Sequence, residues 1–542
     1  MSNKKNVLIL LLFIQLTVWG QKLSQDFAVT VGTPYKVVDA DDKQYFSDGK
    51  GHAISVKTID EKVIIQTFDV NSLKEVSRKE YKDFPERNKI QNVVQAGDKL
   101  YYLFACENKK VMDIYSREID IVKGTFAEPR KLFSSSRELM PAAWVDIGKP
   151  VMFSPLGQPR VIEVLKSFDN SKILLRYRLR PETRDDSKSY DVLGFYVFNS
   201  AGMDKVWGGE VTMPYTEKLM NNVAFGVGKD GNAYMISMQT EVKRLELLNI
   251  TADLKTKANP LDIDANLMFQ KIDLRETPDG NLTGVGYYAN GLDFKYSFVG
   301  GMSVSMNTNG IMSFKMDRNG KILSKYDFEF PIELINQFEK ERDQNKNAKR
   351  EEKGKAGIAD LMVRDVSVAA DGSTTVIGEQ QYTSASRAYS TTMGNSSKPV
   401  FYYADVVATK YDKNGKLLWM KKLPKTQYGY QGKGMMSIKY VRGKAFHYVL
   451  YIDHEDNTNP NYLTGGAPKQ YLDNKGGYLM AYKIDDATGN AERHTIADIK
   501  DIKGTEAFQF KTSRIFDAAD NTFLLEVYIK GKEDTLIKMV LN

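Results

Sequence analysis

The sequence predicts an all-β chain built from repeated four-stranded units, and three observations lead to that prediction. The 542 residues include 30 Tyr and 26 Phe, and Gly outnumbers Pro 40 to 16, which is typical of many short strands joined by turns. Residues 407–424 have the pattern of a β-hairpin, with Asn414-Gly415 where the chain must reverse and where a tight turn needs positive φ angles. Degraded copies of this hairpin recur along the chain.

The spacing of the recurring turns tests whether the repeat is real. In three units the glycines of the two turns are 40, 43 and 46 residues apart: Gly280 and Gly320, Gly372 and Gly415, and Gly443 and Gly489. The four-stranded blades of β-propellers repeat at about 40 to 50 residues. In the second unit the corresponding distance, from Gly97 to Gly124, is only 27 residues, so the repeat is imperfect. The spacing therefore predicts a single β-propeller.

The predicted units divide the chain into eight blades. Their approximate bounds are residues 35–85, 89–135, 158–214, 218–262, 266–331, 357–424, 432–500 and 505–542. The eighth unit has only three strands, the first at residues 508–515, whereas residues 27–31 (FAVTV) form a strand without a unit. We expect this N-terminal strand to complete the eighth blade, since closure removes exposed sheet edges. The alternatives are seven blades, with one unit misassigned, or two separate β-domains.

One stretch of the chain resembles a known class of protein. The segment from Asp412 to Trp419 reads Asp-x-Asn-Gly-Lys-x-x-Trp and resembles the blades of secreted bacterial β-propellers, which are loosely quinoprotein-like. The resemblance implies a multi-bladed propeller. The full wording stands only once, since the fifth unit has Ser324 at the tryptophan position, and no functional residue is carried over from the class.

The first 20 residues have the pattern of a secretory signal peptide. Lys4 and Lys5 precede an apolar run over residues 7–14, and a cleavage site is expected before Gln21. The run is short for a membrane span, although an uncleaved anchor is the alternative, and no later stretch predicts a transmembrane segment. We therefore expect the propeller to occupy residues 21–542 of an exported protein, either periplasmic or secreted to the cell surface.

Composition and missing motifs argue against several classes of function. The net charge of +7 is spread over the chain without a long basic block, so nucleic-acid binding is not predicted. The single cysteine, Cys106, lies in an apolar strand pattern and is expected to be a core residue. The sequence has no phosphate-binding loop, nucleophile elbow or His-Glu-x-x-His pair, and we predict neither a cofactor nor a metal site.

Long connections concentrate on one face of the predicted propeller. In an antiparallel blade, the turns from first to second and from third to fourth strand lie at one face, and all other connections lie at the opposite face. Short Gly-rich turns fill the first set, and nearly all insertions fall in the second. These insertions are residues 138–150, 180–189, 383–399 and 455–477, and residues 333–355, which have the pattern of a short helix. Binding usually resides where long loops cover a rigid scaffold.

The candidate binding residues lie in or beside two of these insertions. They are Arg387, Tyr389, Tyr402 and Tyr403 around the first, and Asp453, His454, Glu455, Asp456 and Tyr462 around the second. Tyrosine offers a large contact area with a polar tip, which suits sugar or peptide recognition. The acidic segment could bind a hard cation or transfer protons, but it lacks the spacing of an EF-hand. Strand packing and a solvated loop are the alternative interpretations.

The sequence favours a binding or scaffold protein whose long-loop face engages a protein or glycan. The alternative is a glycan-active hydrolase or lyase that uses carboxylates such as Asp453, Glu455 and Asp456 near the mouth of the central channel. No catalytic motif distinguishes the two, and the sequence indicates neither the ligand nor the oligomeric state.

Overall fold

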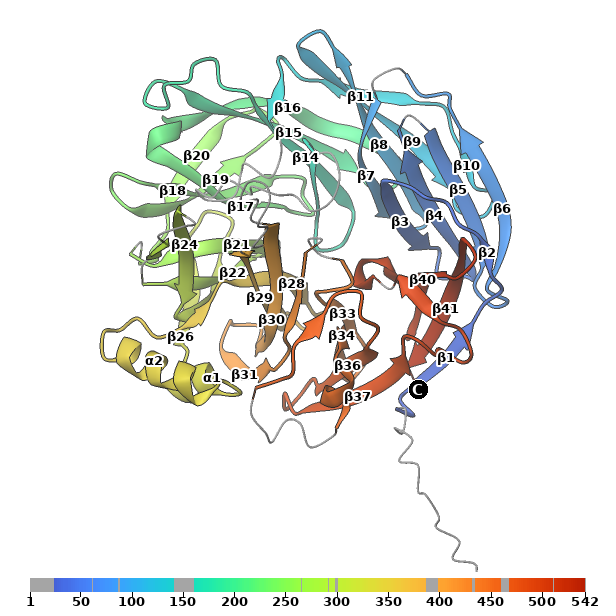
Figure 1. Cartoon of the computed structure of the whole chain (residues 1–542). Helices are drawn as coiled ribbons and strands as arrows, with labels where there is room; N and C mark the ends of the chain where they lie inside the picture. The colour runs from blue at the N-terminus through green and yellow to red at the C-terminus, as the bar shows by residue number, and fades with distance from the viewer. Residues whose placement is uncertain are drawn as a thin grey trace, which may run out of the picture.

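Eight blades, each a β-sheet with four main strands, follow one another around a ring, and short additional strands pair with several of them (Figure 1). The computed structural model describes residues 24–541 apart from 61, 86–87, 141–159, 265, 291, 298–300, 387–397, 431–433, 460–466 and 510. The prediction of one eight-bladed propeller is confirmed, and the alternatives of seven blades or two domains are wrong. The predicted signal peptide lies outside the described residues. Within the described part of the chain, no helix is long and apolar enough to cross a membrane.

The first four blades each use consecutive strands, from the axis of the ring outward. Blade 1 contains β3 (Asp42–Ser47), β4 (His52–Ile59), β5 (Lys62–Asp69) and β6 (Lys74–Tyr81). Blade 2 contains β7 (Asn88–Ala96), β8 (Lys99–Asn108), β9 (Val111–Asp120) and an outer strand divided into β10 (Thr125–Phe126) and β11 (Arg130–Ser134). Blade 3 contains β13 (Glu163–Lys166), β14 (Lys172–Leu179), β15 (Tyr190–Asn199) and β16 (Asp204–Thr216), with β12 (Leu139–Met140) beside β14. Blade 4 follows the 3-10 helix η2 (Glu217–Leu219) and contains β17 (Met220–Val227), β18 (Ala233–Gln239), β19 (Arg244–Ile250) and β20 (Thr256–Pro260).

The next three blades carry the additional elements. Blade 5 contains β21 (Met268–Glu276), β22 (Leu282–Ala289), β25 (Gly310–Met316) and β26 (Ile322–Glu329), with a hairpin of β23 (Leu292–Ser297) and β24 (Gly301–Thr308) between its middle strands. Blade 6 contains β28 (Leu361–Val368), β29 (Thr374–Ser386), β30 (Lys398–Tyr411) and β31 (Leu417–Leu423), and the short β27 (Ile358–Ala359), β32 (Gln427–Gly429) and β35 (Tyr471–Leu472) lie beside it. Blade 7 contains β33 (Lys439–Arg442), β34 (Phe446–Asp453), β36 (Tyr478–Asp485) and β37 (Ala491–Asp498), with the 3-10 helix η3 (Glu455–Thr458) after β34.

Blade 8 joins the two ends of the chain, as predicted. It contains β39 (Ile515–Ala519), β40 (Thr522–Ile529), β41 (Glu533–Leu541) and, as its outer strand, β1 (Phe27–Val31). The short β2 (Tyr35–Lys36) also pairs with β41, and β38 (Ala507–Gln509) lies beside β40. β1 pairs antiparallel with β41, from Phe27 opposite Leu541 to Val31 opposite Ile537. The predicted first strand at residues 508–515 is wrong, because the 3-10 helix η5 (Thr512–Arg514) interrupts it and the inner strand begins only at Ile515.

A shared turn closes the short-turn face of several blades. At Asp412 the side chain accepts hydrogen bonds from the backbone N–H groups of Asn414 and Lys416, and the Gly415 N–H donates to the Asp412 carbonyl. Gly415 adopts a φ of +88°, and the corresponding glycines of four other turns, Gly231, Gly280, Gly320 and Gly372, lie between +80° and +86°. Asn414 does not adopt the positive φ that we expected, because the Asp412 carboxylate fixes a turn that needs only one left-handed residue.

The hydrophobic core lies between the blades. Buried side chains form eight clusters, and each cluster joins two neighbouring blades. Phe27 and Val29 of β1 pack with residues of blades 7 and 8 in one of them. Cys106 is buried in another, and burial raises the pKa of its thiol to about 11, which fits its predicted place in the core.

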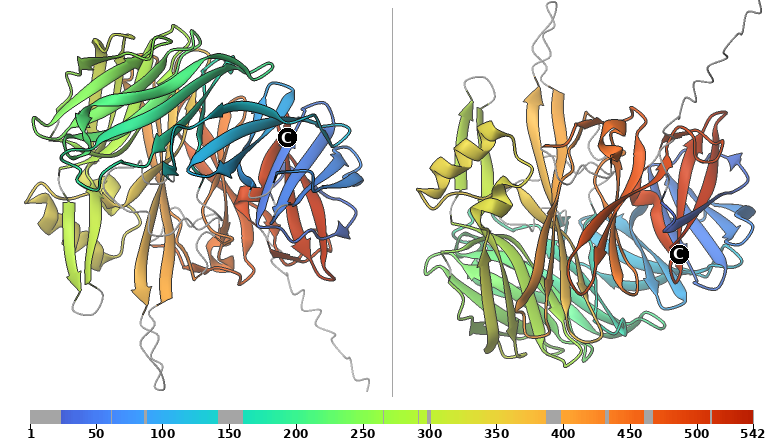
Figure 2. Two further views of the ribbon diagram at one scale, coloured as in Figure 1. Left: turned by 90° about the horizontal axis from the view of Figure 1, so that it is seen from above. Right: turned by 90° about the horizontal axis from the view of Figure 1, so that it is seen from below.

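The long-loop face carries elements that protrude from the ring. Figure 2 shows the hairpin β23–β24 and the extended strands β29 and β30 projecting on the same side, with the helices beside the hairpin. The predicted helix over residues 333–355 is two helices, α1 (Ile332–Asn336) and α2 (Glu341–Glu351), because Phe338 between them adopts a left-handed φ of +64°. The hairpin β23–β24 was not predicted.

The closing strand gives a direct test of the fold. Phe27 is 7% exposed and its ring meets Tyr448 edge-on at 5.6 Å, whereas Thr30 on the other side of β1 is exposed. Phe27→Ala is expected to lower the free energy of unfolding by about 3 kcal/mol through the cavity it leaves, and Thr30→Ala by less than about 0.5 kcal/mol. Urea unfolding monitored by fluorescence measures both, and equal midpoints for the two variants would contradict the role of β1 in the ring.

Candidate functional site

The helical insertion is fixed to blade 6 by one buried lysine. The Lys422 ammonium on β31 donates to the backbone carbonyls of Ile335 and Gln337 at 3.0 and 2.9 Å, and it forms ion pairs with Glu339 at 2.9 Å and Asp405 at 3.1 Å. The neighbouring carboxylates raise the pKa of Lys422 above its usual value although burial alone would lower it. The α1–α2 turn is thereby held in one position beside the blade.

A row of stacked tyrosines crosses the extended part of blade 6. Tyr382 of β29 lies opposite Tyr402 of β30, and Tyr402 lies opposite Tyr428 of β32. The first two rings stack with centroids 4.8 Å apart at 8°, and the next pair lies 6.1 Å apart at 21°. Tyr382 is 39% exposed, and Tyr430, two residues beyond Tyr428, is also exposed. We call Tyr382, Tyr402 and Tyr428 the tyrosine row.

The tyrosine row presents three phenol hydroxyl groups. None of the three has a hydrogen-bond partner among the residues that the structure describes. Burial, with a smaller contribution from Tyr402, raises the pKa of Tyr382 to about 12, so its phenol stays protonated near neutral pH. The row therefore offers aromatic edges together with hydrogen-bond donors and acceptors.

Tyr403, the other tyrosine predicted from this segment, belongs to the opposite side of the strand. It is 7% exposed, and its carbonyl accepts from the buried Lys425 ammonium at 3.0 Å. Lys425 in turn pairs with Glu379 at 2.9 Å, and Ser437 donates to Glu379 at 2.7 Å. Burial would raise the pKa of Glu379, but Lys425 and Arg364 outweigh it and hold that pKa below its ordinary value. This buried polar cluster stabilises the base of the extended strands.

The predicted acidic segment follows β34 and forms the 3-10 helix η3. Asp453 is buried, accepts hydrogen bonds from the His454 N–H and the Asn457 side chain, and has the Arg493 guanidinium at 3.6 Å. The exposed Asp456 pairs instead with Lys469, and the His454 ring accepts from the Asp456 N–H. Glu455 is exposed. The three carboxylates thus face different surroundings and do not converge on one pocket.

Three predicted residues, Arg387, Tyr389 and Tyr462, lie outside the described residues. Among the described residues, no group of three or more His, Cys, Asp or Glu side chains is arranged to hold a metal ion.

A small axial pocket of about 120 Å³ lies between the inner strands of blades 3, 4 and 5. Its charged lining includes Glu163 and Arg176, which form an ion pair, and Asp273 and Arg275, whose side chains lie 2.5 Å apart. The Arg176 guanidinium also stacks 3.4 Å from the centre of the Phe225 ring. Both lining carboxylates are therefore each bound by an arginine, and Lys271 also lines the pocket.

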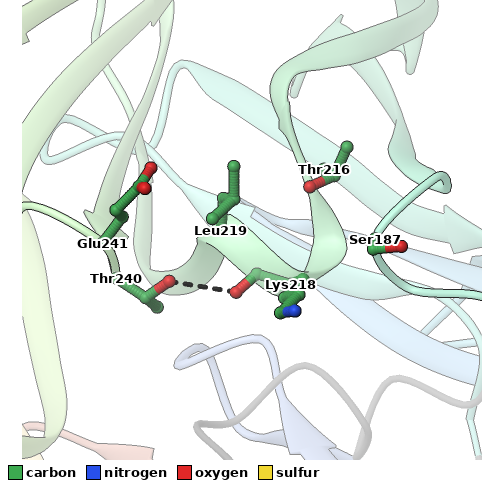
Figure 3. Close-up of a pocket in the computed structure, with 6 residues that line it drawn as sticks. All are labelled: Ser187, Thr216, Lys218, Leu219, Thr240 and Glu241. Atoms are coloured by element: carbon green, nitrogen blue, oxygen red, sulfur yellow. Dashed lines mark hydrogen bonds between the residues drawn. The ribbon is translucent and has the colours of Figure 1, made fainter.

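A wider hollow lies between blades 3 and 4 on the long-loop face. Its volume is about 400 Å³, and it is lined by Ser187, Thr216, Lys218, Leu219, Thr240 and Glu241 (Figure 3). The Thr240 hydroxyl donates to the Lys218 carbonyl at 3.0 Å, which joins a turn of blade 4 to the connection η2 that leads from blade 3 (Figure 3). The lining is mixed and open, with more apolar than polar surface, and its two charged side chains are Lys218 and Glu241.

Sequence reasoning missed Tyr382, Tyr428 and the axial pocket. The register of the hairpin would have paired Tyr382 with Tyr402, but only if the length of the turn between β29 and β30 had been known. Tyr428 lies in a connection between blades, where no periodic pattern predicts its position. Each ion pair of the axial pocket lies within one blade, but the pocket itself brings together strands of three blades, which no sequence spacing encodes.

Comparisons with known proteins do not assign a family or an activity. No family model matches the chain, and no curated protein matches it. The polysaccharide lyase Uly1 has a TM-score of 0.33 and 8% identity over 83% of this chain and 89% of its own. The Dos1 propeller has a TM-score of 0.38 and 8% sequence identity, and the match covers 94% of this chain and 95% of that propeller. A Dyadobacter fermentans protein of unknown function has a TM-score of 0.31 and 10% sequence identity, and the match covers 96% of this chain and 100% of that protein. Similarities this low carry no argument about function.

The anchor of the helical insertion can be tested with a matched pair of variants. Lys422→Met leaves Asp405 and Glu339 without their cation and is expected to lower the free energy of unfolding by about 3 kcal/mol or more. Glu339→Gln is expected to lower the free energy of unfolding by less than about 1 kcal/mol. Burial raises the pKa of Glu339, so ionising this carboxyl group opposes folding once the pH rises above the ordinary pKa of glutamate. Urea unfolding gives both energies.

Hydrogen exchange over residues 332–351 reports the same anchor locally. Exchange there should accelerate in Lys422→Met before the blades unfold, and unchanged exchange in that variant would contradict the anchoring role of Lys422.

Proposed function

We propose that this protein is an extracytoplasmic binding or scaffold protein that engages a protein or glycan ligand through the long-loop face of blades 5 to 7. The tyrosine row is the observation that carries the proposal. Its three aromatic rings are stacked in one orientation, partly exposed, and carry hydroxyl groups without partners among the described residues. Tyrosines of this kind are common in binding surfaces, since they combine apolar contact with hydrogen bonding.

The surroundings of the tyrosine row support a binding function. The strands β29 and β30, with 13 and 14 residues, extend beyond the blade, and the hairpin β23–β24 projects on the same side (Figure 2). Lys422 fixes the α1–α2 turn beside β30, and Lys425 joins Glu379 of β29 to the Tyr403 carbonyl of β30, in both cases with buried, charge-assisted hydrogen bonds. A surface ordered before binding loses less conformational entropy when a ligand binds. The pattern of residues 1–20 supports an extracytoplasmic location.

Substitutions in the tyrosine row test the proposal. Tyr382→Ala combined with Tyr402→Ala is expected to weaken ligand binding by at least about tenfold, because exposed aromatic anchors contribute most of the binding energy. Tyr326→Ala is the matched control: this tyrosine is 40% exposed but lies on β26, the outer strand of blade 5. Glycan-array binding and affinity capture from the extracytoplasmic fraction distinguish a glycan from a protein ligand.

A second variant removes the protruding tip without disturbing the row. Thr383 and Phe401 lie opposite each other, so an Asn-Gly turn can replace residues 384–400 and close the hairpin. Partner sets and glycan profiles that are identical for the native protein, the double tyrosine variant and the shortened variant would overturn the proposed binding face.

A further inference from the structure

Two cationic side chains lie where blades 8 and 1 meet near the axis of the ring. Lys43 is the second residue of β3, the inner strand of blade 1, and Arg514 ends η5, directly before the inner strand of blade 8. β3 contacts both η5 and β39. Inner strands begin at the long-loop face, since the connections between blades lie there. Both cations are therefore at the end of the axis that the long loops surround.

Neither cation forms an ion pair with a residue that the structure describes. Arg514 is 7% exposed, yet its Nη1 atom is buried without any hydrogen-bond partner. Lys43 is half-buried, and its ammonium forms no ion pair or hydrogen bond with a described residue. A buried guanidinium normally binds a carboxylate, phosphate or carbonyl, because an unpaired buried charge is costly.

The two carboxylates near these cations, Glu526 and Asp534, both face the buried Lys57 ammonium, and neither Asp534 oxygen has a hydrogen-bond partner among the described residues. Glu526 binds the buried Lys57 ammonium at 2.6 Å and accepts from the hydroxyls of Tyr35 at 2.8 Å and Tyr45 at 2.5 Å. Asp534 lies 3.5 Å from the same Lys57 ammonium. Two carboxylates therefore face three cations, Lys57, Lys43 and Arg514, and the joint carries an excess of positive charge.

The titration of Lys43 reflects this excess. Burial, followed by repulsion from Arg514 and Lys57, lowers the pKa of Lys43 to about 8, although Glu526 and Asp534 act in the opposite direction. Burial and then Arg514 also lower the pKa of Lys511, one turn before Arg514. An added anion between these groups would relieve the repulsion.

We propose that Lys43 and Arg514 form a binding site for an oxyanion, such as a carboxylate, sulfate or phosphate group, at the long-loop end of the joint between blades 8 and 1. The guanidinium presents a planar fork of donors that matches an oxyanion, and the lysine adds a mobile point charge. This site is independent of the tyrosine row, which lies on blade 6. It adds a class of ligand, an anion, that the binding-face proposal does not specify.

Titration of the purified protein with anions tests the site. Sodium sulfate, phosphate and glucuronate are added at constant ionic strength against chloride, and binding is measured by calorimetry and by the thermal unfolding midpoint. At least one oxyanion is expected to bind with a saturable isotherm and to raise the thermal unfolding midpoint, since a ligand that binds only the folded state stabilises that state. Preference for glucuronate indicates a carboxylate ligand, and preference for sulfate or phosphate indicates a tetrahedral one.

Variants locate the bound anion. Lys43→Gln and Arg514→Gln are each expected to weaken binding by at least about tenfold, because each removes a charge-assisted hydrogen bond. Lys50→Gln is the control, since this exposed lysine lies in the turn after β3 on the opposite face. Affinity should also fall as the pH rises through about 8, because Lys43 then loses its proton. The charged groups that act on Lys43 are Arg514, Lys57, Glu526 and Asp534.

Acylation of Lys43 in the native protein gives a readout that does not depend on a variant folding. A saturating oxyanion should raise the pKa of Lys43 and slow its acylation, measured by mass spectrometry at pH 7.5, by at least about threefold, whereas Lys50 should be unaffected. Equal midpoint shifts in the native protein and both variants, or oxyanion effects no larger than those of chloride, would overturn the proposal. Unchanged acylation of Lys43 would do the same.

Discussion

The pairing of β1 with β41 is the constraint on which the rest of the ring depends. Every other blade is made of consecutive chain, but blade 8 takes its outer strand from the N-terminal end. Phe27 and Val29 also complete the core between blades 7 and 8, so the closing strand contributes to two blades at once. Without this strand β41 would present an open edge, and open edges favour association with other chains.

The joint between blades 8 and 1 is closed by polar contacts as well as by packing. The Lys57 and Glu526 side chains are fully buried, and they link β4 of the first blade to β40 of the last. Removing both charges from water is costly, and the hydroxyls of Tyr35 and Tyr45 offset part of that cost by binding Glu526. An ion pair at this position fixes which strands meet, since a shifted register would leave Lys57 or Glu526 buried and unpaired.

The sequence predicted what is encoded locally. The Asp-x-Asn-Gly wording predicted turns because each turn is stabilised by its own aspartate and one left-handed glycine, and both can be seen in four or five residues. Blade number followed from counting these turns. The hairpin β23–β24 was not predicted because its strands have the same sequence pattern as those of a blade. The break between α1 and α2 was not predicted because no local sequence pattern indicates the left-handed φ of Phe338.

The candidate sites depend on contacts between distant segments, and the sequence could not predict those. Tyr402 and Tyr403 are adjacent and looked equivalent, yet one lies in an exposed row and the other packs above the buried Lys425. Which side each tyrosine faces depends on strand register, and register was unknown. Asp453 looked like an exposed acid, but Asn457 and Arg493 hold it inside. Burial of this kind is set by tertiary packing, which local composition does not reveal.

The placement of buried charge explains how one face can carry long segments without losing order. Lys422 and Lys425 lie three residues apart around the end of β31, and each binds backbone carbonyls and carboxylates from segments that leave the blade. An apolar side chain at either position could pack, but it could not satisfy the carbonyl groups of irregular backbone. The tyrosine row can then remain partly exposed, because Lys425 holds the strand of Tyr402 through the neighbouring Tyr403 carbonyl. Such a surface is ordered before it meets a ligand, and the binding free energy is not spent on folding the loops.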